Sequence, residues 1–198
     1  FLVAFIIGII IFTLNMVWQN YLKNPLISFC VYKSQNFLAV NLIRPFFQFS
    51  FSAFLFIFPL YMQNGKGYSA VITGLILLIM TIVIAFSSPI TGKINDKIGP
   101  KAPIIISQVL AVIGYVLLSF VNIYNINWVI LSFGLVLTGL NIGIMFSSSN
   151  LLATISLPSN RKGVGFGMFT ANAFISTSLG IAIIGYIYAN VNLSHFYT

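Results

Sequence analysis

Asp96 is the only acidic side chain in the 198 residues, and it lies in a lysine-rich string that runs from Gly92 to Lys101. A carboxylate in this setting can pair with Lys93 and Lys97, or interact with the positive end of a following helix. Long apolar runs flank the string, so we expect it to form a short loop at the edge of a membrane. At that position Asp96 is a poor candidate for a proton carrier inside the membrane.

Arg44 is the second residue of chemical interest, because it lies about eight residues into an apolar segment at 37–62, or roughly 12 Å from its start. A cation at that depth costs about 2.5 kcal/mol or more unless it reaches water or finds a partner. One helical face carries four polar residues within about an 80° arc, namely Asn41, Arg44, Gln48 and Ser52. This stripe indicates a face that lines a water-filled cavity. The alternative is a snorkelling arginine beside polar packing residues.

A weaker stripe follows the segment 128–152 and consists of Gly134, Thr138, Asn141, Met145 and Ser149. Glycine pairs at 139 and 143, and at 163 and 167, are typical of helices whose backbones approach closely. Packing between helices is the favoured interpretation of this face. Thr138, Asn141 and Met145 are nevertheless kept as candidate cavity-lining residues.

Neither enzymatic nor metal chemistry is indicated. Cys30 and His195 are the only residues of their types, which excludes an intrachain disulfide and a cysteine zinc cluster. No nucleophile, base and acid occur together, so we expect no enzyme, no metal site and no cofactor. The net charge of +8 comes from nine basic residues spread along the chain, which argues against nucleic-acid binding.

The elements that must position these residues are membrane helices. The chain is 59% hydrophobic and 5% charged, with a mean hydropathy of +1.05, which excludes an ordinary soluble domain. Continuous apolar runs predict helices rather than a barrel. Six segments approach the about 20 residues that a crossing needs: 1–18, 37–62, 70–91, 103–121, 128–152 and 164–189. The predicted fold class is therefore an all-α integral membrane protein with six transmembrane helices.

Charge sets the orientation of these spans. Basic residues gather in the loops at 19–36, 92–102 and 153–163, whereas the opposite loops carry only Lys66. The positive-inside rule places the basic loops in the cytoplasm of a multi-pass cell-membrane protein. Residues 19–36 are too polar to span the bilayer and are predicted to form a cytoplasmic connector. Because the chain starts at Phe1 without methionine, we expect a fragment of a longer protein.

The string around Asp96 resembles the signature loop of the major facilitator superfamily. The match involves Gly92, Asp96, Lys97, Gly99 and Lys101, and Pro100 departs from the basic residue that is usual there. Further strings, at 24–26, 32–38, 58–63 and 67–70, are similar to the 14-helix drug:proton antiporters of that superfamily. The resemblance extends over nearly the whole chain.

This resemblance implies a partial major-facilitator-type helix bundle. Residues 1–18 would be a central extra transmembrane helix, 19–36 the cytoplasmic connector, and 37–198 the C-terminal transporter domain with five of its six helices. The missing N-terminal transporter half would carry the coupling carboxylates. The signature residues would form a latch loop on the cytoplasmic side, with Asp96 as a latch residue.

The resemblance also implies a function. A proton-coupled secondary transporter in a bacterial plasma membrane would export amphipathic drugs or toxic organic compounds by alternating access. It would contact membrane lipid, its small amphipathic substrate and the missing N-terminal half, with the proton gradient as its energy source. The alternatives are a metabolite permease of the same superfamily and a non-transporting membrane scaffold subunit.

Overall fold

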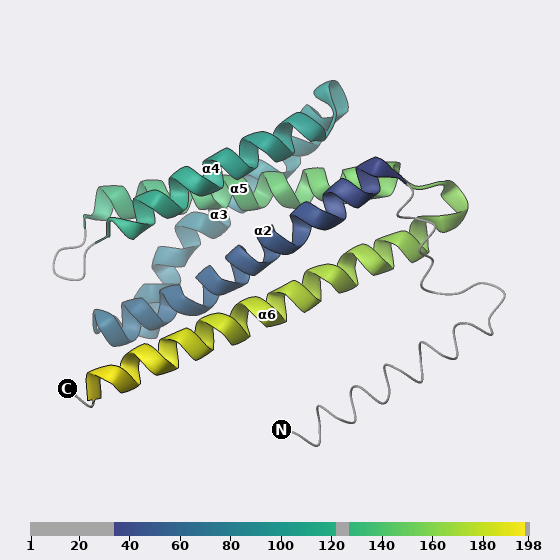
Figure 1. The fold of residues 1–198 in the computed structure, drawn as a ribbon. Coiled ribbons are helices and arrows are strands. Elements are labelled where there is room, and N and C mark those ends of the chain that lie inside the picture. Colours follow the sequence, from purple (N-terminus) through teal and green to yellow (C-terminus); the bar gives the residue numbers. More distant parts are fainter. Residues whose placement is uncertain (1–33, 122–126, 197–198) are drawn as a thin grey trace, which may run out of the picture.

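The computed structural model describes residues 34–121 and 127–196, which form helices joined by short connections (Figure 1). The helices are α2 (Gln35–Leu60), α3 (Ala70–Ile98), α4 (Lys101–Ser119), α5 (Trp128–Ile155) and α6 (Lys162–Phe196). A π-helical turn, Tyr61–Gly65, extends α2, and a 3-10 turn, Ser159–Arg161, precedes α6.

Five of the described helices are long and apolar enough to cross a membrane. They coincide with the five predicted spans that begin at residue 37 and beyond, so the all-α membrane class is confirmed for this part of the chain. The remaining predicted span, at 1–18, lies outside the described residues. Residues 19–33 of the predicted connector at 19–36 also lie outside the described residues.

Polar side chains begin three of these helices by accepting hydrogen bonds from otherwise unpaired amide groups of the first turn. Ser34 accepts from the amide of Phe37, and Ser69 accepts from the amide of Ile72. The side-chain oxygen of Asn127 accepts from the first amides of α5. The starts of α2, α3 and α5 are therefore encoded locally, by one polar residue before each apolar run.

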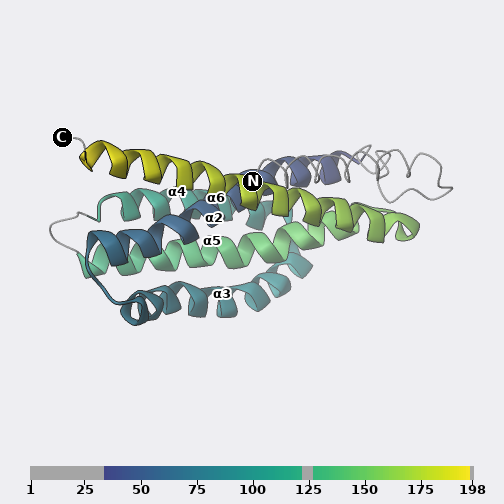
Figure 2. The same ribbon diagram turned by 90° about the horizontal axis from the view of Figure 1, so that it is seen from below.

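The bundle is organised around α5, which packs against α3 and α4, whereas α2 pairs with α6 and also touches α5. Turned by 90°, the bundle shows α3 and α6 on opposite sides with α5 between them (Figure 2). The buried core includes Leu131, Leu135 and Ile142 of α5 and the phenylalanines Phe47 and Phe54 of α2. This arrangement brings the polar stripe of α2 toward α5 and α6.

Close approach of α3 and α5 depends on the first predicted glycine pair. A Cβ atom at Gly139 would lie 2.8 Å from the carbonyl oxygen of Met80, and one at Gly143 would collide with Ser87. The prediction of close packing is thus confirmed at this pair. At the second pair, residues 163 and 167, a Cβ atom would meet nothing within 4 Å, so the described residues contain no close approach there.

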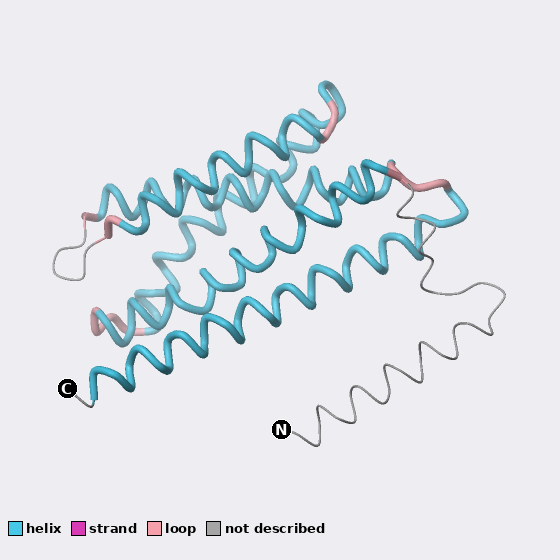
Figure 3. Tube along the Cα trace, viewed as in Figure 1, coloured by secondary structure: helices cyan, strands magenta, loops and turns pink. Residues whose placement is uncertain are grey.

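The lysine-rich string is helical over most of its length, which corrects the predicted loop at 92–102. Helix α3 continues to Ile98, and only Gly99 and Pro100 separate it from α4 (Figure 3). Gly99 has a φ of 78°, a conformation that favours glycine. Asp96 therefore lies in the last turn of α3, and it does not cap α4, whose N-cap residue is Pro100. The predicted loop at 153–163 is also shorter, because α5 reaches Ile155.

Successive helices run in opposite directions, so the basic residues gather at one end of the bundle. Lys93, Lys97 and Lys101 lie where α3 meets α4, and Lys162 begins α6 at the same end, on the right in Figure 1. Lys66 follows α2 at the opposite end. This segregation matches the orientation inferred from the positive-inside rule.

Candidate functional site

Arg44 lies inside the bundle rather than at its surface, with only 5% of the residue exposed. Its Nη1 donates hydrogen bonds to Ser149 Oγ at 2.5 Å and to Asn150 Oδ1 at 3.4 Å, both on α5. The side chain is thus held between α2 and α5. It is directed into the protein, where ionisable groups of membrane helices usually find partners.

Three aromatic rings surround the guanidinium group of Arg44. Its central carbon lies 4.6 Å from the ring centroid of Phe146, 4.9 Å from that of Phe169 and 5.8 Å from that of Phe47. A desolvated cation over an aromatic face gains about 2 kcal/mol. The rings, which come from α5, α6 and α2, therefore offset part of the cost of burying this charge. We call Arg44 and these three phenylalanines the arginine cage.

Pro45 accounts for one hydrogen bond between α6 and α2. A proline has no N–H, so the carbonyl of Asn41, four residues earlier, has no donor within its own helix. The side-chain nitrogen of Asn172 on α6 donates to this carbonyl at 2.9 Å. A neighbouring helix thereby supplies the hydrogen bond that the proline removed, as membrane helices with internal prolines require.

Polar atoms on the α2 stripe remain without hydrogen-bond partners among the described residues. They are Asn41 Oδ1, Arg44 Nε and Gln48 Oε1, and all three are buried. Leaving a buried polar group unpaired costs about 1–3 kcal/mol. Three such atoms on successive turns of one helix indicate a place where a further polar group can bind.

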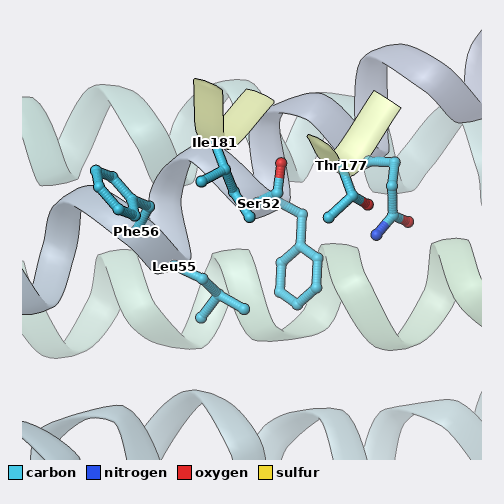
Figure 4. A pocket seen from close by; sticks show the side chains of 7 residues that line it. Ser52, Leu55, Phe56, Thr177 and Ile181 are labelled. Carbon is cyan, nitrogen blue, oxygen red and sulfur yellow. The ribbon is translucent and has the colours of Figure 1, made fainter. Parts of the chain in front are cut away.

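A groove of about 240 Å³ opens between α2 and α6, next to this stripe. Its lining comes from both helices and is mostly apolar, with Gln48, Phe51, Ser52, Leu55, Phe56, Thr177 and Ile181 contributing. Figure 4 shows Leu55 and Phe56 of α2 together with Thr177 and Ile181 of α6 around it. Two residues of the predicted cavity-lining stripe, Gln48 and Ser52, therefore border the groove, while Asn41 and Arg44 are buried and do not line it.

The candidates on α5 lie elsewhere, at the interface with α4. Thr138, Asn141 and Met145 are each at most 1% exposed. The side-chain nitrogen of Asn141 donates to the carbonyl of Ser107 at 2.7 Å, and that of Gln108 donates to the Met145 sulfur at 3.4 Å. None of the three lines the groove, so in the described structure they pack helices together.

At the cytoplasmic end, the buried residue is Asn95 and not its acidic neighbour. Asp96 is exposed, whereas Asn95 is 4% exposed and accepts a hydrogen bond from Ser148 Oγ at 2.9 Å. Sequence reasoning missed Asn95. Its signal is the four-residue spacing of Ser87, Thr91 and Asn95, which are all buried on one face of α3.

Sequence reasoning also missed Asn172 and Asn150, the side chains of α6 and α5 that bond to the polar stripe of α2. Asn172 was not selected, although Pro45 inside an apolar segment signals a carbonyl that needs a donor from another helix. Asn150 ends a run of four polar residues, 147–150, within apolar α5. Such a run is a detectable signal, but nothing local indicates which helix it faces.

A bundle of membrane-length helices with a buried cation beside a groove is the arrangement found where substrates or ions pass through membrane proteins. The chain belongs to the Major Facilitator Superfamily, whose family model matches residues 1–181. This membership confirms the resemblance noted in the sequence. Members of this superfamily are membrane transporters and not enzymes.

Curated relatives carry names that refer to drug resistance. The chain is 26% identical over 168 residues to "Multidrug resistance protein Stp" of Mycobacterium tuberculosis, covering 84% of this chain and 31% of that protein. It is 26% identical over 200 residues to "Quinolone resistance protein NorB" of Staphylococcus aureus, covering 100% of this chain and 43% of that protein. The chain thus spans less than half the length of these relatives. No solved structure matches it.

Proposed function

We propose that this chain forms part of a proton-coupled secondary transporter that exports amphipathic organic compounds by alternating access. The observation that carries the proposal is the buried Arg44 of a membrane helix, next to unpaired polar atoms and a largely apolar groove. An amphipathic molecule needs both kinds of surface. The drug-resistance names of the two relatives support export rather than uptake.

Proton coupling would depend on residues outside this chain. Asp96 is the only acid in the sequence, and it is exposed in the last turn of α3, outside the central part of any described helix. A carboxylate there lies at the end of the bundle and not inside the membrane-spanning part of a helix. We therefore assign the proton-binding carboxylates to the rest of the intact transporter.

For Asp96 we propose a role as a latch at the cytoplasmic end, together with Gly92, Lys97, Gly99 and Lys101. Its exposure leaves it able to contact another part of the intact protein. The buried Asn95–Ser148 hydrogen bond holds the end of α3 on α5, and so gives the latch a fixed base. Asp96→Asn should lower transport while membrane abundance stays unchanged, as measured by efflux normalised to the amount of protein. Equal loss of transport and abundance would instead indicate a role in folding or topology.

The function itself is tested with the intact protein that contains this chain, reconstituted in liposomes. A fluorescent amphipathic compound should move against its own gradient when an opposing proton gradient is imposed. It should stop when a protonophore collapses that gradient. Uptake in the same direction as protons would favour a metabolite permease. If no amphipathic compound moves in response to the proton gradient, the proposal is wrong.

A further inference from the structure

Arg44 is a positive charge without a compensating negative charge in the described part of the chain. It lies in the central part of α2, whereas the other charged residues of the described helices are near helix ends. Its hydrogen-bond partners, Ser149 and Asn150, are neutral. Rings and amides stabilise a buried cation, but they do not neutralise it. A negative group that reached the cage would therefore be attracted strongly in this low-dielectric setting.

The geometry of the cage leaves one edge of the guanidinium group buried but without a hydrogen-bond partner among the described residues. Phe146 and Phe169 are the aromatic rings closest to its central carbon, and Nη1 is occupied by the two side chains of α5. Nε has no partner among the described residues. The Nε edge of a guanidinium binds the two oxygens of a carboxylate in parallel, which is the geometry that makes arginine selective for such groups.

The groove adjoins the cage through Phe51. Phe51 lines the groove, and its ring stacks parallel to that of Phe47 with centroids 6.1 Å apart. The same ring meets Phe146 edge-on at 6.3 Å. Gln48, one helical turn after Arg44, also lines the groove and has an unpaired oxygen. Because Arg44 Nε is itself buried, an anionic group in the groove would reach it only after side chains between them, such as Phe51, moved.

We infer that this groove and cage together select substrates that carry an anionic oxygen group, a carboxylate or sulfonate, on an apolar or aromatic body. The inference rests on the proposed function and narrows its substrate class. The apolar body would lie in the groove between α2 and α6, and the anionic group would bind the Nε edge of Arg44. A permanent cation of the same size would be repelled by Arg44 and would find no carboxylate among the residues that line the groove.

Binding to the detergent-solubilised intact protein separates this inference from transport. Titration calorimetry would compare naphthalene-2-sulfonate with a naphthyl-trimethylammonium salt, which have similar bodies and opposite fixed charges. We expect the sulfonate to bind at least tenfold more tightly. Arg44→Gln should weaken sulfonate binding at least tenfold and leave the ammonium compound unaffected or bound more tightly. As a matched control, Lys162→Gln removes one positive charge at the cytoplasmic end and should change neither affinity.

A second variant protects the test against misfolding of Arg44→Gln. Gln48→Glu adds an acid beside the groove without removing the arginine, and it should reverse the preference toward the ammonium compound. Equal affinity for the two compounds in the original protein would overturn the inference. So would an equal loss of both affinities in Arg44→Gln, which would indicate that Arg44 holds the site together and does not select for charge. If the protein showed the expected charge selectivity in binding but no proton-driven transport, the proposed function would be refuted and this inference would stand.

Discussion

Asn172→Leu should weaken the contact between α2 and α6, and the loss should depend on Pro45. In the structure the Asn172 side chain donates to the carbonyl of Asn41 at 2.9 Å, because Pro45 cannot. A hydrogen bond between membrane helices contributes about 0.6 kcal/mol on average and up to about 1.7 kcal/mol. An unpaired buried carbonyl costs about 1–3 kcal/mol. We expect Asn172→Leu to lower the free energy of unfolding by about 1–2 kcal/mol.

Pro45→Ala should rescue this variant, because an alanine at that position would supply the missing N–H within α2. In that background we expect Asn172→Leu to cost about 1 kcal/mol less than in the original sequence, which is a coupling that a double-mutant cycle detects. The assay is denaturant unfolding of the intact protein in mixed micelles, followed by tryptophan fluorescence. Ser178→Ala is the matched control, since this exposed residue bonds only within α6 and should leave stability unchanged. The same cost in both backgrounds would refute the assignment of Asn172 as the replacement donor.

Two further predictions concern α3 and α5. Gly139→Leu should greatly reduce the yield of folded protein, because even its Cβ would lie 2.8 Å from the Met80 carbonyl oxygen. Gly167→Leu adds its side chain in open space and should be tolerated. Thermal-shift midpoints would compare the two variants, and equal midpoints would contradict the packing account. Asn95→Leu and Ser148→Ala should each lower the free energy of unfolding by about 1 kcal/mol. The double variant should show a coupling of about 0.6–1.7 kcal/mol. Additive effects would show that the hydrogen bond contributes nothing to stability.

Hydropathy located the five described spans but not their ends. The prediction ended the second of them at residue 91, whereas α3 continues to Ile98. A hydropathy window detects solubility in lipid, and four of the seven residues after Thr91 in α3 are charged or polar: Lys93, Asn95, Asp96 and Lys97. The helix nevertheless continues, because its backbone hydrogen bonds do not require lipid around them, and it ends only where Gly99 adopts a positive φ.

The sequence predicted that the candidate residues share one helical face, but not what that face contacts. Helical periodicity alone placed Asn41, Arg44, Gln48 and Ser52 on one face. The same reasoning grouped Thr138, Asn141 and Met145, yet these three pack against α4. Polar residues on a membrane helix look alike in sequence whether they border a groove or hydrogen-bond to a neighbour. The distinction requires knowledge of the helix that faces them.

The sequence by itself determined the membrane class, the helical spans, their orientation and the superfamily, because these follow from local composition, charge and motif. The tertiary structure decided what surrounds Arg44. Its partner Ser149 lies 105 residues away along the chain, and Phe169 comes from yet another helix. Contacts at such separations depend on how all the helix faces pack together, which no single segment encodes. The buried cation was therefore visible in the sequence, and its cage, its unpaired edge and its groove were not.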